Sequence, residues 1–407
     1  MKCRHCHSPL QLDFVDLGFS PPSNAYLDAA RLSAPETYYP LRVKVCEQCW
    51  LVQTEDFARH DELFDAGYAY FSSTSSTWLA HAQKYVEMIA RRLGLGPQSL
   101  VVEVAANDGY LLQYVLQQGI RCVGVEPTHS TAKAARERGL EIEEIFLGVN
   151  SAEALRARHG AADLVVANNV LAHVPDINDF VAGIAHLLTP QGTVTFEFPH
   201  VQNLIEQIQF DTIYHEHFSY LSLLAVQPIL RQAGLRVYDV ELLPTHGGSL
   251  RVYACPQGAV HAEQPAVAAT LAGERSAGLD QPQVYRDFQS RADVVRLGLQ
   301  AFLLEQKRLG KKVLGYGAAA KGNTLLNYAG VDGLLVEQVA DAAPSKQGKY
   351  LPGSHIQVIT PQALMDARPD FVLILPWNLK HEVMRQLAGI REWGGQFVVA
   401  IPEVEIL

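Results

Sequence analysis

The chain has 407 residues, 48% of them hydrophobic, and a formal net charge of −10 at pH 7. A chain of this length is too long for one ordinary hydrophobic core, so we expect two or three domains. The acidic balance argues against nucleic acid as a partner, and no apolar run reaches the roughly 18–20 residues of a membrane span. Because the first ten residues also lack the apolar stretch of a secretory signal, we expect a cytoplasmic protein with no membrane partner.

Residues 1–60 predict a small zinc-binding module. So short a segment buries little core by itself, and cysteine pairs in a reducing compartment are more often metal ligands than disulfides. His5 and His7 are nearby alternative ligands. Four thiolates around zinc leave no open coordination position, so we expect a structural rather than a catalytic ion. The predicted ligands are the two Cys-x-x-Cys pairs Cys3, Cys6, Cys46 and Cys49.

Residues 61–257 predict a second domain in which strands and helices alternate. It begins with a helix, because apolar residues in 73–95 recur with a spacing near 3.6. Alternating βα units imply a doubly wound parallel sheet of the Rossmann type. The expected segments are a strand–helix–strand–helix run over 99–140, a strand and loop over 162–174, and strands within 192–201 and 249–256.

Residues 258–407 predict a third domain. Its first part, 258–300, is rich in Ala, Gln and Arg and has helical character. A second α/β unit begins at residue 311 with "KKVLGYGAAAKGNTLLNYAG", which indicates another Rossmann-like domain. Further strands are expected within 336–344, 370–378 and 396–402.

The segment "VVEVAANDGYLL" predicts a cofactor loop between a strand and a helix. The strand carries Glu103 and runs through small residues, which allow close backbone approach, into Asn107, Asp108 and Gly109. Glu126 ends the next strand, where a carboxylate can bind both ribose hydroxyls of an adenosine ligand. An ordinary tight βα turn is the alternative reading of this loop.

Two adenosine cofactors are compatible with that arrangement. NAD requires G-x-G-x-x-G, which is missing here, and Asp108 would repel its pyrophosphate. S-adenosylmethionine carries a sulfonium and an ammonium and tolerates acid, so the charge favours it. The third strand ends in "NNVLAHV", which places Asn168 and Asn169 at a carboxyl strand end with His173 on the loop beyond.

Together these features resemble the sugar C-methyltransferases that act on nucleotide-linked keto-deoxysugars. The resemblance covers essentially the whole chain, from the two Cys-x-x-Cys pairs through the E-x-A-x-N-D-G loop and "NNVLAH" to "YHEHFSYLS" and "GYGAAAKG". It implies a zinc-binding domain, an S-adenosylmethionine domain and a C-terminal domain that helps to hold a nucleotide-sugar, for which we expect a TDP-linked sugar. The best-known members methylate the sugar C-3 position; C-5 stays open.

The resemblance also transfers catalytic residues motif by motif. Tyr214, Glu216 and His217 match the family's Y-x-E-H pattern, and His173 matches the histidine after its Asn-Asn loop. The family contributes a tyrosine from the segment after its zinc module. Either Tyr68 or Tyr70 of "GYAYFSST" fits that position, and we prefer Tyr68.

C-methylation explains why these groups gather. Carbon has no lone pair, so a proton must first leave a carbon next to a ketone, where the charge spreads as an enolate. We predict His217 as the general base, because a histidine is mostly neutral at pH 7. Glu216 is expected to orient the base, hold its imidazolium or bind a sugar hydroxyl. Tyr68, Tyr214 and His173 are expected to donate hydrogen bonds to the oxyanion.

The remaining predicted site residues would bind substrate. Lys321, after a partial dinucleotide loop, is expected to face a pyrophosphate together with backbone N–H groups, with Lys346 and Lys349 on a loop near the same mouth. The residue pair Trp377-Asn378 is expected to stack on or hydrogen-bond a nucleobase. In "THGGSLRVYA", His246 precedes two glycines that suggest a close backbone approach, and Arg251 pairs with either phosphate or an acidic neighbour.

Three alternative functions stay open at this point. One is an O- or N-methyltransferase on a related nucleotide sugar. Another is a non-catalytic binding protein whose zinc module recruits a partner. The third is an NAD enzyme that uses the C-terminal loop. We expect a monomer.

Overall fold

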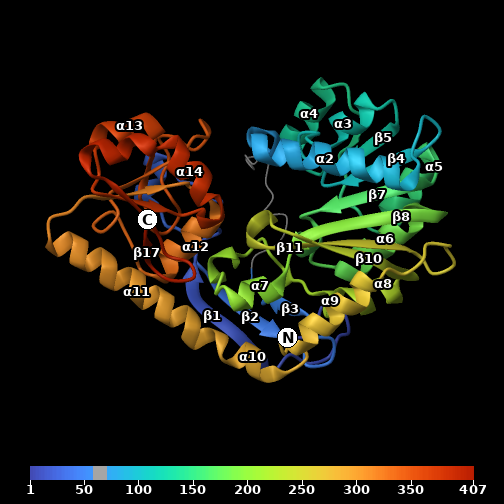
Figure 1. Ribbon diagram of the computed structural model, residues 1–407, viewed down its shortest axis with the longest axis horizontal. Helices are drawn as coiled ribbons and strands as arrows, with labels where there is room; N and C mark the ends of the chain where they lie inside the picture. The colour runs from blue at the N-terminus through green and yellow to red at the C-terminus, as the bar shows by residue number, and fades with distance from the viewer. Residues whose placement is uncertain (58–70) are drawn as a thin grey trace.

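The computed structural model describes residues 1–57 and 71–407, which form two α/β lobes bridged by N-terminal strands (Figure 1). The described residues contain a seven-stranded, a six-stranded and a four-stranded sheet. In Figure 1 the seven-stranded sheet lies at the right, the lobe with the C-terminus at the left, and β1 and β2 run beneath and between them. The predicted α/β class, with an N-terminal module and two Rossmann-like units, is confirmed.

The N-terminal sheet is antiparallel and has the strand order β1-β2-β3-β9. Its last strand comes from far along the chain, because Val52 pairs with Tyr220 at the end of "TIYHEHFSY". The histidine-rich motif is therefore attached to the edge of the zinc module. The strands are β1 (Leu12–Ser20), β2 (Tyr39–Val45), β3 (Val52–Thr54) and β9 (Ser219–Tyr220).

The seven-stranded sheet has the order β10-β11-β8-β7-β4-β5-β6. Its first five strands along the chain are parallel, as the βα pattern predicts, and the last two pair antiparallel at one edge. All parallel strands therefore present their carboxyl ends on one side. The strands are β4 (Leu100–Val104), β5 (Arg121–Val125), β6 (Ile142–Glu143), β7 (Ala162–Asn168), β8 (Leu188–Pro199), β10 (Leu235–Leu243) and β11 (Ser249–Pro256).

Helices cover both faces of this sheet, as expected for a doubly wound fold. The predicted helix within 73–95 is shorter than expected, because the Ser75 hydroxyl caps its start and Gly94, with φ 63°, ends it. The helices are α2 (Ser76–Leu93), α3 (Leu112–Gln117), α4 (His129–Glu137), α5 (Val149–His159), α6 (Ile177–Leu187), α7 (Val201–Glu206) and α8 (Leu223–Gln232).

The C-terminal lobe follows three helices, α9 (Pro265–Ser276), α10 (Pro282–Arg286) and α11 (Phe288–Arg308). Its sheet has the order β14-β13-β12-β15-β16-β17 and is parallel except at β17. The strands are β12 (Val313–Tyr316), β13 (Gln338–Ala340), β14 (Gln357–Ile359), β15 (Phe371–Ile374), β16 (Gln396–Val399) and β17 (Glu405–Ile406). The helices are α12 (Ala320–Tyr328), α13 (Pro361–Ala367) and α14 (Lys380–Gln386).

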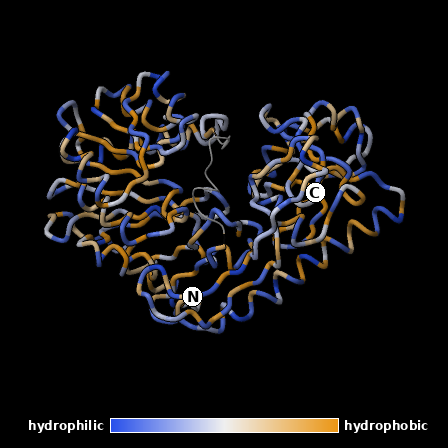
Figure 2. Tube along the Cα trace, turned by 180° about the vertical axis from the view of Figure 1, so that it is seen from behind, coloured by the Kyte–Doolittle hydropathy of each residue, from blue (hydrophilic) through white to orange (hydrophobic). Residues whose placement is uncertain are grey.

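The N-terminal module shares hydrophobic cores with both lobes. Its cysteines and Leu51 belong to the core under the seven-stranded sheet. On its other side, Phe14 of β1 stacks on Phe288 of α11 with 4.3 Å between ring centroids. The hydrophobic segments in Figure 2 accordingly run along the strands inside each lobe and continue through the N-terminal region. The module therefore holds the two lobes together.

Among the described helices, none combines the length and the apolar character that crossing a bilayer would require.

Candidate functional site

The four predicted cysteines converge in the N-terminal module. Their Sγ atoms all lie within 4.8 Å of one another. The Sγ atoms of Cys3 and Cys49 are 3.5 Å apart, and those of Cys6 and Cys46 are 3.4 Å apart. Tetrahedral zinc with Zn–S bonds of about 2.3 Å sets its sulfur ligands ~3.8 Å apart, so these thiols fit the ion.

The two Cys-x-x-Cys turns have the same backbone geometry. The residue after each pair, His7 or Trp50, has a positive φ of 61° or 60°. Its N–H donates to the carbonyl of the first cysteine of the pair, at 3.0 and 2.8 Å. The imidazole of His5 bonds Asn178 at 2.9 Å, and His7 is exposed, so neither alternative ligand joins the cluster. The zinc site is closed by four thiolates and is structural, as predicted.

The loop between β4 and α3 has a strained left-handed backbone. The φ angle is 58° at Ala105, 50° at Asn107 and 78° at Gly109. A Cβ at Gly109 would lie 2.2 Å from the side chain of Leu140, so packing against the neighbouring segment requires this glycine. The Asn107 amide oxygen accepts the N–H of Ser72 at 2.9 Å, which ties the loop to the segment before α2.

Asp108 does not present a free negative charge. Its carboxylate lies 3.3 Å from the Arg138 guanidinium and accepts the Ser73 hydroxyl. The Arg138 guanidinium also donates to the Asp108 carbonyl at 2.6 Å. The prediction that Asp108 would repel a pyrophosphate is therefore wrong in its mechanism, because a sequence pattern does not show a partner 30 residues away.

Other buried acids around this loop do fit a cationic cofactor. Burial, reinforced by the charge of Glu126, raises the pKa of Glu103 well above its usual value, and a cation bound beside it would favour its ionised form. Both oxygens of Glu126 accept backbone N–H groups, from Asn107 and Thr128, at 2.9 Å. Among the described residues, buried amide or carboxylate oxygens of Asp108, Asn168 and Asn169 have no hydrogen-bond partner, as expected where a polar ligand binds.

The predicted catalytic histidines form one cluster with Tyr214. The ring centroid of His217 lies 3.9 Å from that of Tyr214 and 4.6 Å from that of His173. All three residues are half-buried, so each keeps an accessible edge. The 3-10 turn after β7 and the segment before β9 bring them together, and the N–H of Phe218 bonds the carbonyl of Ala172 at 2.8 Å.

Backbone carbonyls fix the tautomer of both imidazoles. His217 Nδ1 lies 2.8 Å from the carbonyl oxygen of Thr212, and His173 Nδ1 lies 2.9 Å from that of Glu216. A carbonyl only accepts, so each Nδ1 carries the hydrogen and each neutral ring keeps its lone pair at Nε2. Burial lowers the pKa of His173 to about 4 and that of His217 well below its usual value, so both are neutral at pH 7.

Two sequence expectations change with this tautomer. A neutral His173 with hydrogen on Nδ1 has an acceptor at Nε2, so it does not donate to an oxyanion as we predicted. Glu216 does not orient His217 either, because Thr212 does so. The Glu216 carboxyl is buried and instead accepts the Asn24 amide, which lies 2.8 Å from each of its oxygens.

Glu216 gives a testable pH dependence. Burial raises the pKa of Glu216 to about 7, from 4.5 for an ordinary glutamate. Its contribution to stability is therefore complete below pH 4.5 and is lost as the pH rises through 7. Because glutamine cannot ionise, we expect Glu216→Gln to gain about 2.5 kcal/mol of unfolding free energy relative to wild type between pH 5 and pH 8.

Urea denaturation of both proteins at the two pH values measures this gain. Glu206→Gln is the matched control, because Glu206 is an exposed glutamate on α7 whose replacement should change stability little at either pH. A stability difference between Glu216→Gln and wild type that stays constant with pH would contradict the prediction.

Lys321 of the C-terminal lobe lies near the histidine cluster, where its charge lowers the pKa of His217 and of His246. Its ammonium bonds the Asn378 amide oxygen at 2.8 Å and lies 4.8 Å from the centre of the Trp377 ring. The Trp377 indole donates to buried Asp211 at 2.8 Å, and a Cβ at Gly247 would lie 2.4 Å from that ring. Trp377 therefore joins the two lobes, and its expected role in nucleobase stacking has no support from these contacts.

His246 lies at the same junction in a left-handed conformation, with φ 54°. Its Nε2 is 3.4 Å from the Asn169 amide, and its ring lies 5.1 Å from Trp78 of α2. Burial, with the charge of Lys321 next, lowers the pKa of His246 to about 4. The predicted cofactor residue Asn169 and the predicted substrate residue His246 therefore adjoin one another.

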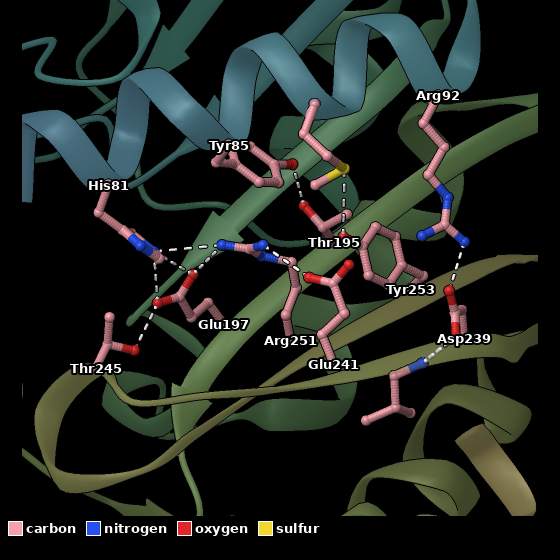
Figure 3. Close-up of polar contacts among 12 residues, drawn as sticks. His81, Tyr85, Arg92, Thr195, Glu197, Asp239, Glu241, Thr245, Arg251 and Tyr253 are labelled. Carbon is pink, nitrogen blue, oxygen red and sulfur yellow. Dashed lines mark hydrogen bonds and ion pairs between the residues drawn. The ribbon is translucent and has the colours of Figure 1, made fainter.

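Figure 3 shows a charge cluster centred on buried Glu197, near the end of β8. Arg251 lies 2.8 Å from Glu197 and 2.9 Å from Glu241, so its partners are acidic neighbours rather than phosphate. Glu197 also accepts the His81 imidazole at 2.9 Å and the Thr245 hydroxyl at 3.0 Å. The cluster ties α2, β11 and the turn before His246 to one carboxylate.

The other predicted lysines lie on the segment after β13. Lys346 donates to the carbonyl of Ala318 at 2.6 Å, at the start of the glycine-containing loop, and is 3.7 Å from Asp341. Lys349 is half-buried three residues further on. Tyr68 and Tyr70 lie outside the described residues.

Sequence reasoning missed several residues that shape the site. Asn24, Thr212 and Asp211 act through contacts with residues distant in the chain or through their backbone. The Pro-rich segment "SPPSNAYL" was a weak signal for Asn24, because it predicts an irregular loop but no partner. His81 and Glu197 carried no motif at all.

Comparison with known proteins matches three family descriptions in chain order. A putative zinc binding domain matches residues 3–64, a methyltransferase domain matches 78–240, and a C-methyltransferase C-terminal domain matches 244–402. The C-methyltransferase NovU of Streptomyces niveus is 37% identical over 406 residues, which cover 100% of this chain and 96% of that protein.

Two further similarities cover less of the chain. The ubiquinone biosynthesis O-methyltransferase of Bordetella avium is 32% identical over 98 residues, 24% of this chain and 41% of that protein. Among solved structures, an S-adenosylmethionine-dependent methyltransferase from Anabaena variabilis covers 50% of this chain and 96% of its own, with 14% identity and a TM-score of 0.40.

Proposed function

The chain belongs to the C-methyltransferase family and is an S-adenosylmethionine-dependent C-methyltransferase, and on that premise we propose that its acceptor is a carbon next to the ketone of a nucleotide-linked 4-keto-deoxysugar. We propose C-3 of the sugar as the methylated position and deoxysugar biosynthesis as the setting. A TDP-linked sugar is the proposed substrate, bound by a monomer in the cytoplasm.

The observation that carries this proposal is the tautomer of His217. Its Nδ1–H is held by the Thr212 carbonyl, so its Nε2 has the lone pair that a general base needs. A low pKa keeps that nitrogen unprotonated at neutral pH. Oxygen and nitrogen acceptors already have a lone pair, so methyl transfer to them does not require a base that removes a proton from carbon.

The chain's residues then divide the reaction between them. His217 Nε2 takes the proton from the acceptor carbon, and the bonding electrons move into an enolate whose charge lies on the ketone oxygen. The cofactor supplies a methyl group on a sulfonium for in-line attack by that carbon. Tyr214, whose ring lies 3.9 Å from that of His217, and Tyr68 are proposed to donate to the ketone oxygen.

Glu216 and the C-terminal lobe are proposed to hold the sugar nucleotide. A buried carboxyl beside the cluster suits a sugar hydroxyl as its partner. Lys346 and Lys349 are proposed to contact the pyrophosphate, because Lys346 bonds the loop that opens α12 and Lys349 lies three residues further along the same segment. Packing alone explains Gly317 of that loop, because a Cβ there would lie 2.4 Å from Pro376. This glycine is therefore no evidence for a bound dinucleotide.

A substrate pair tests the proposed function. We expect the purified protein to methylate a TDP-linked 4-keto-deoxyhexose and to leave the matching 4-hydroxy sugar unmodified, because only the ketone acidifies the neighbouring C–H bond. Mass spectrometry measures methyl gain, and carbon NMR with a labelled methyl donor locates it. A methyl group on oxygen or nitrogen would support the O- or N-methyltransferase alternative, and equal methylation of both sugars would contradict the enolate route.

A further inference from the structure

Lys321 brings a positive charge from the C-terminal lobe to the catalytic histidines. Its ammonium is anchored by the Asn378 amide and lies over the Trp377 ring. Gly247, next to His246, packs against the same Trp377 ring, and the Thr324 hydroxyl of α12 donates to the Ile213 carbonyl at 2.8 Å, next to Tyr214. These contacts bring Lys321 beside the cluster, where its charge lowers the pKa of His217 and of His246. The loop just before its helix α12 is fixed, because the Tyr26 hydroxyl and the Lys346 ammonium both donate to the Ala318 carbonyl, at 2.5 and 2.6 Å.

The Lys321 ammonium is not neutralised by a close carboxylate. Among residues 1–57 and 71–407, no carboxylate lies within 4.0 Å of the Lys321 ammonium, although Asp211 is near enough to favour the charged form. Arg251, another cation near the junction, is by contrast paired with Glu197 and Glu241. Lys321 is half-buried, so its ammonium has both low-dielectric surroundings and access to a ligand.

We propose that Lys321 is a catalytic residue whose ammonium stabilises the negative charge on the ketone oxygen of the acceptor as His217 removes the proton. This assignment rests on the proposed function and replaces the expectation that Lys321 binds pyrophosphate.

The tautomers of the histidines explain why such a cation is needed. With hydrogen on Nδ1, His173 and His217 both present acceptors at Nε2, and neither donates to an oxyanion. A cation held beside the base would stabilise the transition state more than the ground state, because the ketone is neutral before the proton leaves. Lys321 therefore acts on the same step as the base.

The same placement has a consequence for pH dependence. A cation disfavours protonation of a nearby imidazole, so removing Lys321 should raise the pKa of His217 and move the acidic limb of the kcat/KM profile to higher pH. The described titratable groups that face His217 or Lys321 are His173, Tyr214, Tyr220, His246 and Asp211.

Lys321→Met tests the assignment, because methionine keeps much of the length and removes the charge. We expect kcat for methyl transfer and the rate of solvent deuterium exchange at the acceptor carbon to fall together by about 10²–10³-fold. The dissociation constant of TDP, measured by calorimetry, should change less than about threefold, and added methylammonium should restore part of the exchange in Lys321→Ala. Lys311→Met, at an exposed lysine paired with Asp370, is the matched control and should match wild type.

Two outcomes would overturn the assignment. One is Lys321→Met exchanging deuterium at the wild-type rate under saturating substrate. The other is a tenfold or larger loss of TDP affinity with exchange retained, which would make Lys321 a phosphate ligand. Thermal unfolding and S-adenosylhomocysteine binding of the variant exclude misfolding as the cause of lost exchange. If wild type itself neither exchanges nor methylates, the proposed function fails first.

Discussion

Replacing His217 by asparagine is expected to lower kcat for methyl transfer by about 10²–10⁴-fold. Asparagine keeps a polar side chain that can donate to the Thr212 carbonyl, but it has no lone pair on nitrogen that can accept a proton. The loss should fall on kcat more than on KM, because the base acts only once the acceptor is bound. Steady-state kinetics with a TDP-linked 4-keto-deoxyhexose measures both constants.

His215→Asn is the matched control, two residues away in the same motif. The His215 imidazole bonds the Pro40 carbonyl at 3.2 Å and lies against Tyr39 of β2, outside the cluster of His173, Tyr214 and His217. We expect this variant to lose some stability and to keep kcat within about threefold of wild type. Near-normal turnover of His217→Asn, or equal losses in both variants, would contradict the base assignment.

Removing zinc is expected to unfold the N-terminal module and to destabilise both lobes. Structural zinc contributes about 10–16 kcal/mol in small zinc peptides, as much as the whole stability of a typical domain. Here the ligands lie in the core under the seven-stranded sheet. The four-stranded sheet of the same module includes β9, which follows His217 in the chain and pairs with β3. We therefore expect Cys46→Ser to lower the unfolding temperature by 10 °C or more, on the order of several kcal/mol, and to lower methyl transfer.

Differential scanning calorimetry and metal analysis measure the two sides of this prediction. Wild type should hold one zinc per chain and Cys46→Ser less. Cys122→Ser is the control, because Cys122 is half-buried on β5 and away from the cluster, so zinc content should not change. A Cys46→Ser protein with wild-type unfolding temperature would show that the ion does not support the fold.

Local patterns were sufficient to predict most of the fold. The two Cys-x-x-Cys pairs predicted the ligand set, since each turn has the same short-range geometry. Apolar strands alternating with 3.6-periodic helices predicted both Rossmann-like sheets, because such patterns depend on neighbours a few residues away. The antiparallel pairing of β9 with β3 was not predictable in this way, because it joins residues more than 160 positions apart.

The site was predictable as residue types but not as contacts. The Y-x-E-H motif indicated His217, yet the carbonyl that fixes its tautomer belongs to Thr212, whose side chain carries no signal. The sequence alone shows Asp108 as a free acid, whereas the fold places Arg138 beside it. The sequence likewise allows phosphate or an acidic residue as the partner of Arg251, and the fold provides Glu197 and Glu241. The role of a charged side chain depends on the residues that it contacts, and those contacts are set by the tertiary fold.

The measurement that tests the account most directly is solvent deuterium exchange at the acceptor carbon. The TDP-linked 4-keto-deoxyhexose is incubated in D2O with enzyme and S-adenosylhomocysteine, so that no methyl group is available, and the sugar is examined by proton NMR. We predict that wild type incorporates deuterium at C-3 and that His217→Asn does so at least 10²-fold more slowly. Exchange by His217→Asn at the wild-type rate would contradict the claim that this imidazole removes the proton.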